Sequence, residues 1–334
     1  MDSKSFTNGK DDKPLVIGLY SDAFHEQMTR ATVLDFSQLG WSDADVVAMC
    51  EAIASVGELP NLFALRLWGN KLGAPSGEAV MKLLAVAPAL EEVQLNDDNS
   101  GLLPIRKLPS EPVVDFSAVT HGIASWACIS VLLKHNTVLA ELNLKNCGID
   151  AMLAAEVIAP VIASSTLLRY VNMTGSSIAG MAAIGDALVH STSMNTINID
   201  GVDLPVKQLK GQEPVEALDF HDTGLGVASG IVIAKLIEGN ATVTECNLLK
   251  NNLDTETATM IAKIGTEKGI MLSGIKRDQE KANFVNQGLK RADGILIASD
   301  LKFSTTLTSL DLYNCRLDAE AGKALAKGLE GNTT

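Results

Sequence analysis

The sequence predicts an α/β fold built from stacked repeats of one short strand and one helix. Three observations predict it: short segments alternate apolar and polar residues, the stretches between them have helical spacing, and the pattern recurs about every 28 residues. In the clearest example, 139–149, Leu142 and Leu144 alternate with Asn143 and Lys145, so a strand there has one buried and one solvated face. A strand this short is not stable alone and must pair with copies of itself.

Copies recur along the chain. Four of the ten steps between successive copies are 28 residues, the length of a strand plus a full helix. Apolar spacing of three to four residues predicts helices at 43–55, 151–164, 179–190, 227–239, 255–268, 291–301 and 319–330. The second apolar residues of the predicted strands are Phe36, Leu67, Leu95, Phe116, Leu144, Met173, Ile199, Phe220, Leu248, Phe284 and Leu312.

A longer period of 104 residues indicates that a unit of four repeats was duplicated. Two steps of only 21 residues coincide under this shift, and both contain proline. Leu103–Leu108 in one corresponds to Leu204–Leu209 in the other, and Glu-Pro-Val follows each. We expect irregular returns by loops at both places, and an abbreviated third return after the strand-like piece Ile270–Gly274.

The predicted organisation has three parts. Residues 1–13 are expected to be a disordered tail, residues 14–32 an N-terminal capping segment with a strand at 13–19 as one alternative, and residues 33–334 about 11–12 repeats. No polar repeat closes the C-terminal end, although stacked repeats normally need one. The sequence therefore favours a fragment of a longer protein or an end that docks on a partner.

Composition limits the kind of partner and compartment. A net charge of −13 and a pI near 4.8 disfavour nucleic acid, whose phosphates require clustered Lys and Arg. Five cysteines without a C-x-x-C pair indicate a reducing, cytoplasmic location, and no secretory signal precedes them. No apolar run approaches the roughly 18 residues of a membrane span.

The aligned repeats resemble the ribonuclease-inhibitor-like subfamily of leucine-rich repeats. The best matches are Leu65–Leu72, Leu142–Ile149, Leu248–Leu253 and Leu310–Leu317, with Cys147 and Cys315 at the Asn/Cys position of the motif. The resemblance implies an open right-handed solenoid, a horseshoe, with parallel strands on the concave face and helices on the convex face. It also implies a protein-binding role, because members of this family share a scaffold more than a task.

On the resemblance, the strand residues that flank the buried pair point to the concave face. A solvated sheet face is one reading of them, and a partner surface anchored by the aromatic residues Trp68 and Tyr313 is the other. The predicted partner-binding residues are Arg66, Trp68, Asn96, Asn143, Lys145, Asn172, Asn198, Asp200, Asp219, His221, Asp311 and Tyr313.

Catalysis is not expected. The histidines show no metal-ligand spacing, no Walker-type motif occurs, and Gly224-x-Gly226-x-x-x-Gly230 is interpreted as the turn before a helix. We therefore expect no cofactor, no metal and no small-molecule substrate.

The leading hypothesis is a non-enzymatic protein–protein interaction scaffold, a subunit or adaptor in a multi-subunit complex. One alternative is a GTPase-activating regulator of the leucine-rich-repeat type, for which Arg66, Asn70 and Lys71 are the nearest candidates. Another is the sensing fragment of a larger immune-type receptor.

Overall fold

The computed structural model describes residues 12–117 and 119–330, and the chain divides into two compact units. The first unit comprises residues 1–111 and 119–138, and the second comprises 112–118 and 139–334. The predicted disordered tail falls mostly on residues 1–11, which lie outside the described residues.

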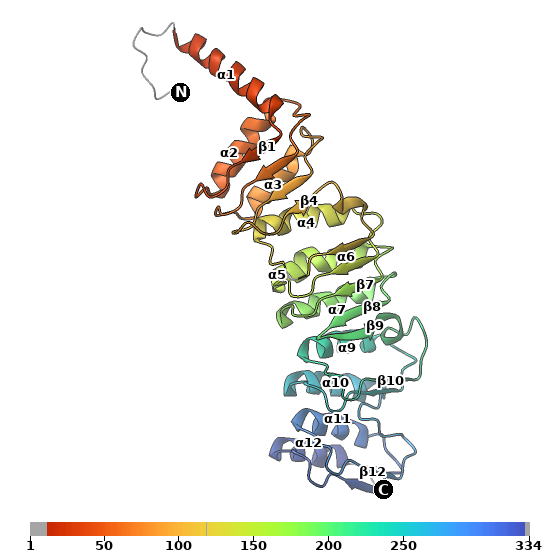
Figure 1. The fold of residues 1–334 in the computed structure, drawn as a ribbon. Helices are drawn as coiled ribbons and strands as arrows, with labels where there is room; N and C mark the ends of the chain where they lie inside the picture. The colour runs from red at the N-terminus through yellow and green to blue at the C-terminus, as the bar shows by residue number, and fades with distance from the viewer. Residues whose placement is uncertain (1–11, 118, 331–334) are drawn as a thin grey trace. The chain divides into compact units, whose positions relative to one another are not determined.

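The first unit contains a four-stranded sheet in the order β1-β2-β3-β4 (Figure 1). Strands β1 to β3 are parallel and in register, and β4 pairs antiparallel with β3. Its elements are α1 (Asp12–Arg30), β1 (Val33–Asp35), α2 (Asp43–Ala54), β2 (Ala64–Arg66), α3 (Ala74–Leu83), β3 (Glu92–Gln94), β4 (Leu103–Pro104), η1 (Leu108–Ser110) and α4 (Ile123–His135).

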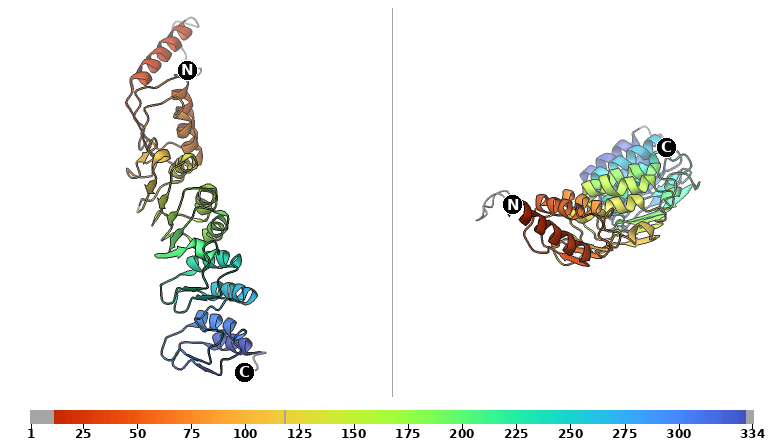
Figure 2. Two further views of the ribbon diagram at one scale, coloured as in Figure 1. Left: turned by 90° about the vertical axis from the view of Figure 1, so that its right-hand side faces the viewer. Right: turned by 90° about the horizontal axis from the view of Figure 1, so that it is seen from above.

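The second unit contains three sheets, ordered β5-β6-β7-β8-β9, β10-β11 and β12-β13. Its first half comprises β5 (Val113–Asp115), β6 (Glu141–Asn143), α5 (Ala151–Leu153), the π-helical η2 (Ala154–Ile158), α6 (Ala159–Ser164), β7 (Tyr170–Asn172), η3 (Ile178–Gly180), α7 (Met181–His190), β8 (Thr196–Ile199), β9 (Val202–Pro205) and α8 (Val206–Leu209). Its second half comprises β10 (Ala217–Asp219), α9 (Val227–Glu238), β11 (Glu245–Asn247), α10 (Thr255–Lys268), β12 (Lys281–Asn283), α11 (Arg291–Leu301), β13 (Ser309–Asp311) and α12 (Ala319–Leu329). Its helices stack side by side on one face of the strands (Figure 2).

Strand and helix alternate as the sequence predicts. Helices α10 and α11 have the predicted bounds, and α9 and α12 differ by one residue at one end. Each strand of the five-stranded sheet contributes a core residue that is at most 3% exposed: Val114, Leu142, Val171, Ile197 and Leu204. Burying each such side chain stabilises the fold by roughly 1.5–3 kcal/mol. A repeating unit of one short strand and one helix is therefore present in the chain's own geometry.

The segment before the first strand is a helix, α1, although a strand was one of the two alternatives predicted there. The strand considered at 13–19 is wrong, because α1 is a helix throughout that range. Short apolar runs such as Leu15–Leu19 do not distinguish strand from helix by periodicity, and Pro14 is tolerated in the first turn of a helix. A capping role for 14–32 stays a prediction.

Where the repeat has Asn or Cys at the motif position, that side chain binds the repeat before it, as at Asn70, Cys147, Asn251 and Cys315. The Cys147 thiol lies 2.9 Å from the carbonyl oxygen of Phe116 and donates to it. The Asn251 amide donates to the carbonyl of Phe220 at 2.8 Å, and its oxygen accepts N–H groups from the preceding turn. Cys147 is thus a turn residue, as predicted, and burial raises the pKa of its thiol to about 11.

The two short returns are more regular than the loops predicted for them. Strand β4 places Pro104 opposite Glu92, and β9 places Pro205 opposite Thr196, in the same antiparallel register. Each is followed by a short helical turn, η1 or α8. The third return is reduced to a single parallel bridge at Met271, which agrees with its predicted abbreviation.

A basic side chain fastens each of the first two returns to the helix before it. Arg106 donates to the carbonyls of Leu84 and Ala87, just beyond α3. Lys210 donates at 2.8 and 2.6 Å to the carbonyls of Leu188 and Ser191, at the end of α7. These carbonyls are equivalent under the 104-residue shift, and cations are favoured at helix C-termini.

Between residues 12 and 330, as far as they are described, no helix has the length and apolar character to span a membrane.

Candidate functional site

The five strands β5 to β9 form the largest sheet among the described residues, and its outward face is lined by polar side chains. The register aligns two rows of side chains across the five strands, and we call these ten residues the strand platform. Each strand contributes its two residues on either side of a buried one, so both point away from the core. One row is Val113, Glu141, Tyr170, Thr196 and Pro205, and the other is Asp115, Asn143, Asn172, Asn198 and Asp203.

The strand platform is acidic and carries one aromatic ring. Asp115, Glu141 and Asp203 are exposed carboxylates, and none of the ten residues is Lys or Arg. Half-buried Tyr170 lies between Glu141 and Thr196 in its row. Burial raises the pKa of the Tyr170 hydroxyl, and the nearby charges of Asp203 and Glu141 raise it further. The arrangement suits hydrogen-bond donors and cations around an aromatic centre.

The second row also shapes the turns that follow the strands. Asn143, Asn172 and Asp115 each accept a hydrogen bond from the backbone N–H two residues later, at 3.1, 3.0 and 2.7 Å. The N–H of Ser117 is the main cause of the lowered pKa of Asp115. Asp and Asn are favoured in such turns for this reason. The same bond occurs in other sheets at Asp35, Asp219, Asn247, Asn283 and Asp311.

Two predicted partner-binding residues, Asn96 and Asp200, accept hydrogen bonds from the first turn of the next long helix. Asn96 is 2% exposed, and its oxygen accepts from Gly122 N–H and from the hydroxyl of Ser125 at the start of α4. Asp200 accepts from Gly226 N–H and from both the N–H and hydroxyl of Ser229 at the start of α9. Asn96 is too buried to contact a partner, so assigning it to one is wrong. Asp200 is exposed and serves the next helix through one carboxylate oxygen, so its place in a partner surface stays a prediction.

The other predicted residues are divided among separate surfaces. Asn143, Asn172 and Asn198 lie in the strand platform, and Lys145 is exposed directly after β6. Asp219 with His221 belongs to the sheet β10-β11, and Asp311 with 72% exposed Tyr313 to the sheet β12-β13. Arg66 and Trp68 lie in the first unit.

The strand platform contains residues that the sequence prediction did not name. Tyr170 and Glu141 stand two positions before Asn172 and Asn143, on the same side of their strands. Alternation alone could have found them. Asp203 could not be found from alternation, because its position depends on the antiparallel pairing of β9. This pairing places Asp203 opposite Asn198, whose side-chain amide donates a 2.6 Å hydrogen bond to the Asp203 carboxylate.

The structure bears on two kinds of site that the sequence analysis considered, a phosphate loop and a metal site. The turn around Gly226 holds the carboxylate of Asp200 at the helix N-terminus, the end of a helix that favours an anion. Within the two described ranges, no three His, Cys, Asp or Glu side chains are grouped to hold a metal ion.

The GTPase-activating alternative loses one of its three candidate residues. Asn70 is 5% exposed and bonded to Phe36, Leu39, Trp41 and Leu67, so assigning it to assist hydrolysis is wrong. Arg66 is exposed and lies 3.7 Å from the Asp35 carboxylate, and Lys71 is exposed.

Comparisons with known proteins give no match to a family model and no match among curated proteins. Among solved structures, the chain is similar to leiomodin-1 actin-binding site 2, with 15% identity, a TM-score of 0.26, and 68% of this chain and 88% of that chain covered. It is similar to the C-terminal domain of tropomodulin from Caenorhabditis elegans (15%, TM-score 0.23, 53% and 92% covered). An internalin from Listeria monocytogenes gives 16% identity, a TM-score of 0.29, and 91% and 87% coverage. TM-scores this low carry no argument about the fold. The repeat fold is therefore inferred from the geometry of this chain alone.

Proposed function

We propose that the chain is a non-enzymatic protein-interaction scaffold, and that the strand platform binds a neutral or basic segment of another protein. The observation that carries the proposal is the position of Tyr170, in the middle strand of the five and beside the carboxylates of Glu141 and Asp203.

The chemistry of the strand platform favours this kind of partner. Tyrosine is enriched among the residues that dominate binding energy, because it offers a large apolar ring and a polar end. The surrounding carboxylates would pair with Lys or Arg of the partner and select against acidic segments. Strands spaced about 4.8 Å apart make a surface roughly 20 Å wide, which fits one extended segment or one helix.

Three finer expectations accompany this proposal. Membership of the ribonuclease-inhibitor-like subfamily and the horseshoe form are supported by the 28-residue alternation of strand and full helix. A reducing, cytoplasmic location is supported by the five cysteines, all of which are free thiols. The roles of adaptor, complex subunit or receptor fragment depend on the partner.

Site-specific photo-crosslinking tests the proposal. A photoreactive phenylalanine analogue replaces Tyr170 in one sample and exposed Met152 of α5, outside the strand platform, in the other. Irradiation in native extract followed by mass spectrometry should give one protein enriched at position 170 over position 152.

The captured protein is then purified and its affinity measured. Tyr170→Ala should weaken binding by about 30-fold, equivalent to the roughly 2 kcal/mol of an interface hot spot. Tyr20→Ala is the matched control, because this exposed tyrosine lies on helix α1 of the first unit, outside the predicted partner surface. Equal capture at positions 170 and 152, or equal affinity for both tyrosine variants, would refute binding at the strand platform.

A further inference from the structure

An open groove of about 590 Å³ lies across the helices α10, α11 and α12, on elements that the strand platform does not include. Its walls come from side chains at helical spacing, such as Thr255, Thr259, Ala262 and Thr266 along α10. Helix α11 forms its middle, where only Ile295 is partly exposed between two buried turns.

The groove stays open because short side chains face it from all three helices. Ala262 and Ala298 are 8% and 6% exposed, and Ala324 faces them from α12. Helix α12 also approaches α11 closely, because Gly328 has no Cβ atom. A Cβ atom at this position would collide with the carbonyl oxygen of Ala298. The floor is therefore apolar and lies below the long side chains at the rim.

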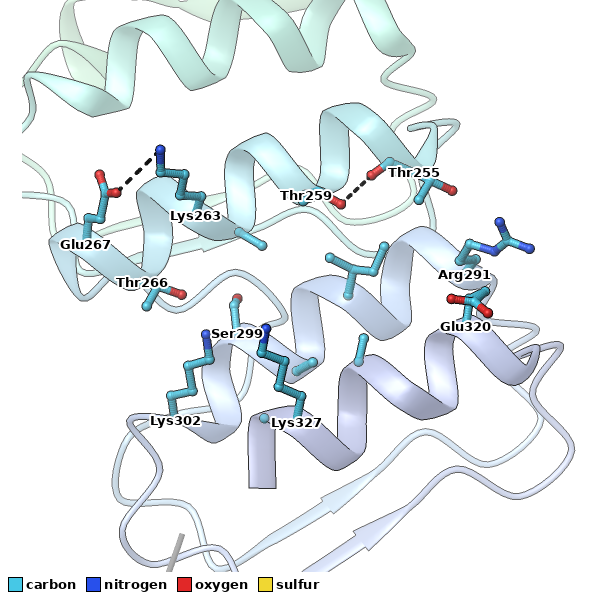
Figure 3. Close-up of a pocket in the computed structure, with 15 residues that line it drawn as sticks. Thr255, Thr259, Lys263, Thr266, Glu267, Arg291, Ser299, Lys302, Glu320 and Lys327 are labelled. Atoms are coloured by element: carbon cyan, nitrogen blue, oxygen red, sulfur yellow. Dashed lines mark hydrogen bonds and ion pairs between the residues drawn. The ribbon is translucent and has the colours of Figure 1, made fainter. Parts of the chain in front are cut away.

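The rim is basic in a chain whose net charge is −13. It carries Lys263, Arg291, Lys302 and Lys327 against only Glu267 and Glu320. Figure 3 shows Lys302 and Lys327 together at one end of the groove, and Arg291 and Glu320 together at the other.

The two ends differ in how their charges are compensated. Arg291 binds Asp318 at 2.6 Å, Glu320 binds Lys323 at 2.7 Å, and Lys263 lies 3.9 Å from Glu267. Neither Lys302 nor Lys327 forms an ion pair with any residue between 12 and 330 that the structure describes. Among the described residues, one end of the groove therefore carries two lysines without a carboxylate partner, beside an apolar floor.

We propose that this groove docks an acidic amphipathic segment of a partner protein, with apolar side chains on Ile295 and Ala298 and carboxylates against Lys302 and Lys327. An apolar floor with charge at one end matches the way that amphipathic helices bind grooves. A small anion would bind the lysines and leave the apolar floor unused. The net charge of the chain repels acidic partners at a distance, so short-range contacts at these two lysines must provide selectivity.

The test uses the full chain and two synthetic amphipathic peptides of about 15 residues, or four helical turns. Both have the same leucine stripe, and one carries Glu where the other carries Lys. Fluorescence anisotropy should show saturable binding of the Glu peptide and binding of the Lys peptide that is at least about 10-fold weaker.

Two variants and one control connect this binding to the groove. Lys302→Glu with Lys327→Glu should weaken the Glu peptide by about 10-fold or more. Lys134→Glu is the matched control, because Lys134 is also an exposed lysine in the last turn of a helix but lies in the first unit. Ala324→Trp fills the groove without changing its charge, and should also abolish binding while circular dichroism shows an unchanged fold.

Three results would overturn the proposal: no saturable binding of the Glu peptide, equal binding of both peptides, or an equal effect of Lys134→Glu. Inorganic phosphate that competes at equimolar concentration would indicate a small-anion site instead. Tyr170→Ala should leave peptide binding unchanged, so this result is separate from the fate of the strand platform.

Discussion

A carboxylate oxygen of Asp200 accepts a 2.7 Å hydrogen bond from the hydroxyl of Ser229, and Asn96 accepts the same 2.7 Å bond from Ser125. The two pairs are 104 residues apart in the chain. In each pair, a residue that follows one strand caps the first turn of the next long helix. The duplication has thus preserved a contact between repeats as well as the length of each repeat.

Removing the cap should destabilise the second unit. Asp200→Ala leaves the N–H groups of Gly226 and Ser229 without their acceptor, and losing a helix cap costs about 0.5–2 kcal/mol. Urea unfolding measures the loss. Asp200→Asn keeps an acceptor, as Asn96 does in the other copy, and should lose much less. If both variants unfold at the same urea concentration, capping does not explain the contribution of Asp200.

Losing the buried amide of Asn251 should cost more. Asn251→Ala leaves the N–H groups of Gly224 and Leu225 and the carbonyl of Phe220 without partners in a buried turn. Each such group costs about 1–3 kcal/mol, so we expect a loss of at least about 3 kcal/mol in thermal or urea unfolding. Cys315→Ser is the comparison, because it retains a donor to the carbonyl of Phe284 and should cost under about 1 kcal/mol. A reversed order of the two losses would contradict the inferred role of this position.

Asp300 predicts an unusual dependence of stability on pH. This carboxyl is fully buried at the end of α11, and burial raises its pKa from 3.8 to about 7 against the opposing hydrogen bonds from Ser273 and Leu272. Between pH 3.8 and about 7, the folded protein therefore keeps a proton that the unfolded chain releases. Asp300 should lower the free energy of unfolding by up to about 1.4 kcal/mol per pH unit as pH rises through this interval.

Comparison with Asp300→Asn isolates this effect from other carboxyls, such as Asp115, whose lowered pKa acts in the opposite direction. Urea unfolding at several pH values should show the stability of wild type falling relative to the variant as pH rises. Parallel curves for the two proteins would mean that Asp300 does not titrate in this interval.

The basic side chains of the short returns should fasten the ends of their helices. Lys210→Met retains the aliphatic stem, removes the bonds to the carbonyls of Leu188 and Ser191, and should cost about 1 kcal/mol. Hydrogen exchange should accelerate in the last turn of α7. The control is Lys207→Met, because Lys207 makes only a 4.0 Å contact with Glu213. Similar rates of hydrogen exchange in the last turn of α7 in both variants would show that Lys210 does not stabilise the end of this helix.

The sequence was most informative where apolar residues repeat at helical spacing, as in α10 and α12, because a long amphipathic pattern fits only a helix. It was least informative at β4 and β9, since strands of two or four residues that contain proline carry little periodic signal. Segment α1 was ambiguous for the related reason that a short apolar run has no period.

The candidate site was predicted only in part. Strand alternation placed Asn143, Asn172 and Asn198 on the outward face, and in the structure each is partly exposed beside a buried strand residue. That they bind a partner stays a prediction. The same rule does not describe Asp200, because the chain has already turned there, with a φ of 55°, and its carboxylate lies against the next helix. The bonds from the Asp and Asn side chains to the N–H two residues later also depend on the turn, which alternation does not describe.

The prolines that mark the duplicated returns have a consequence for the exposed borders of the sheets. Pro104 and Pro205 lie on β4 and β9, the last strands of their sheets. A border strand normally offers unpaired N–H groups to any passing chain, which is one origin of aggregation, and proline has no N–H group to offer. Each return therefore also protects a sheet border against uncontrolled strand addition.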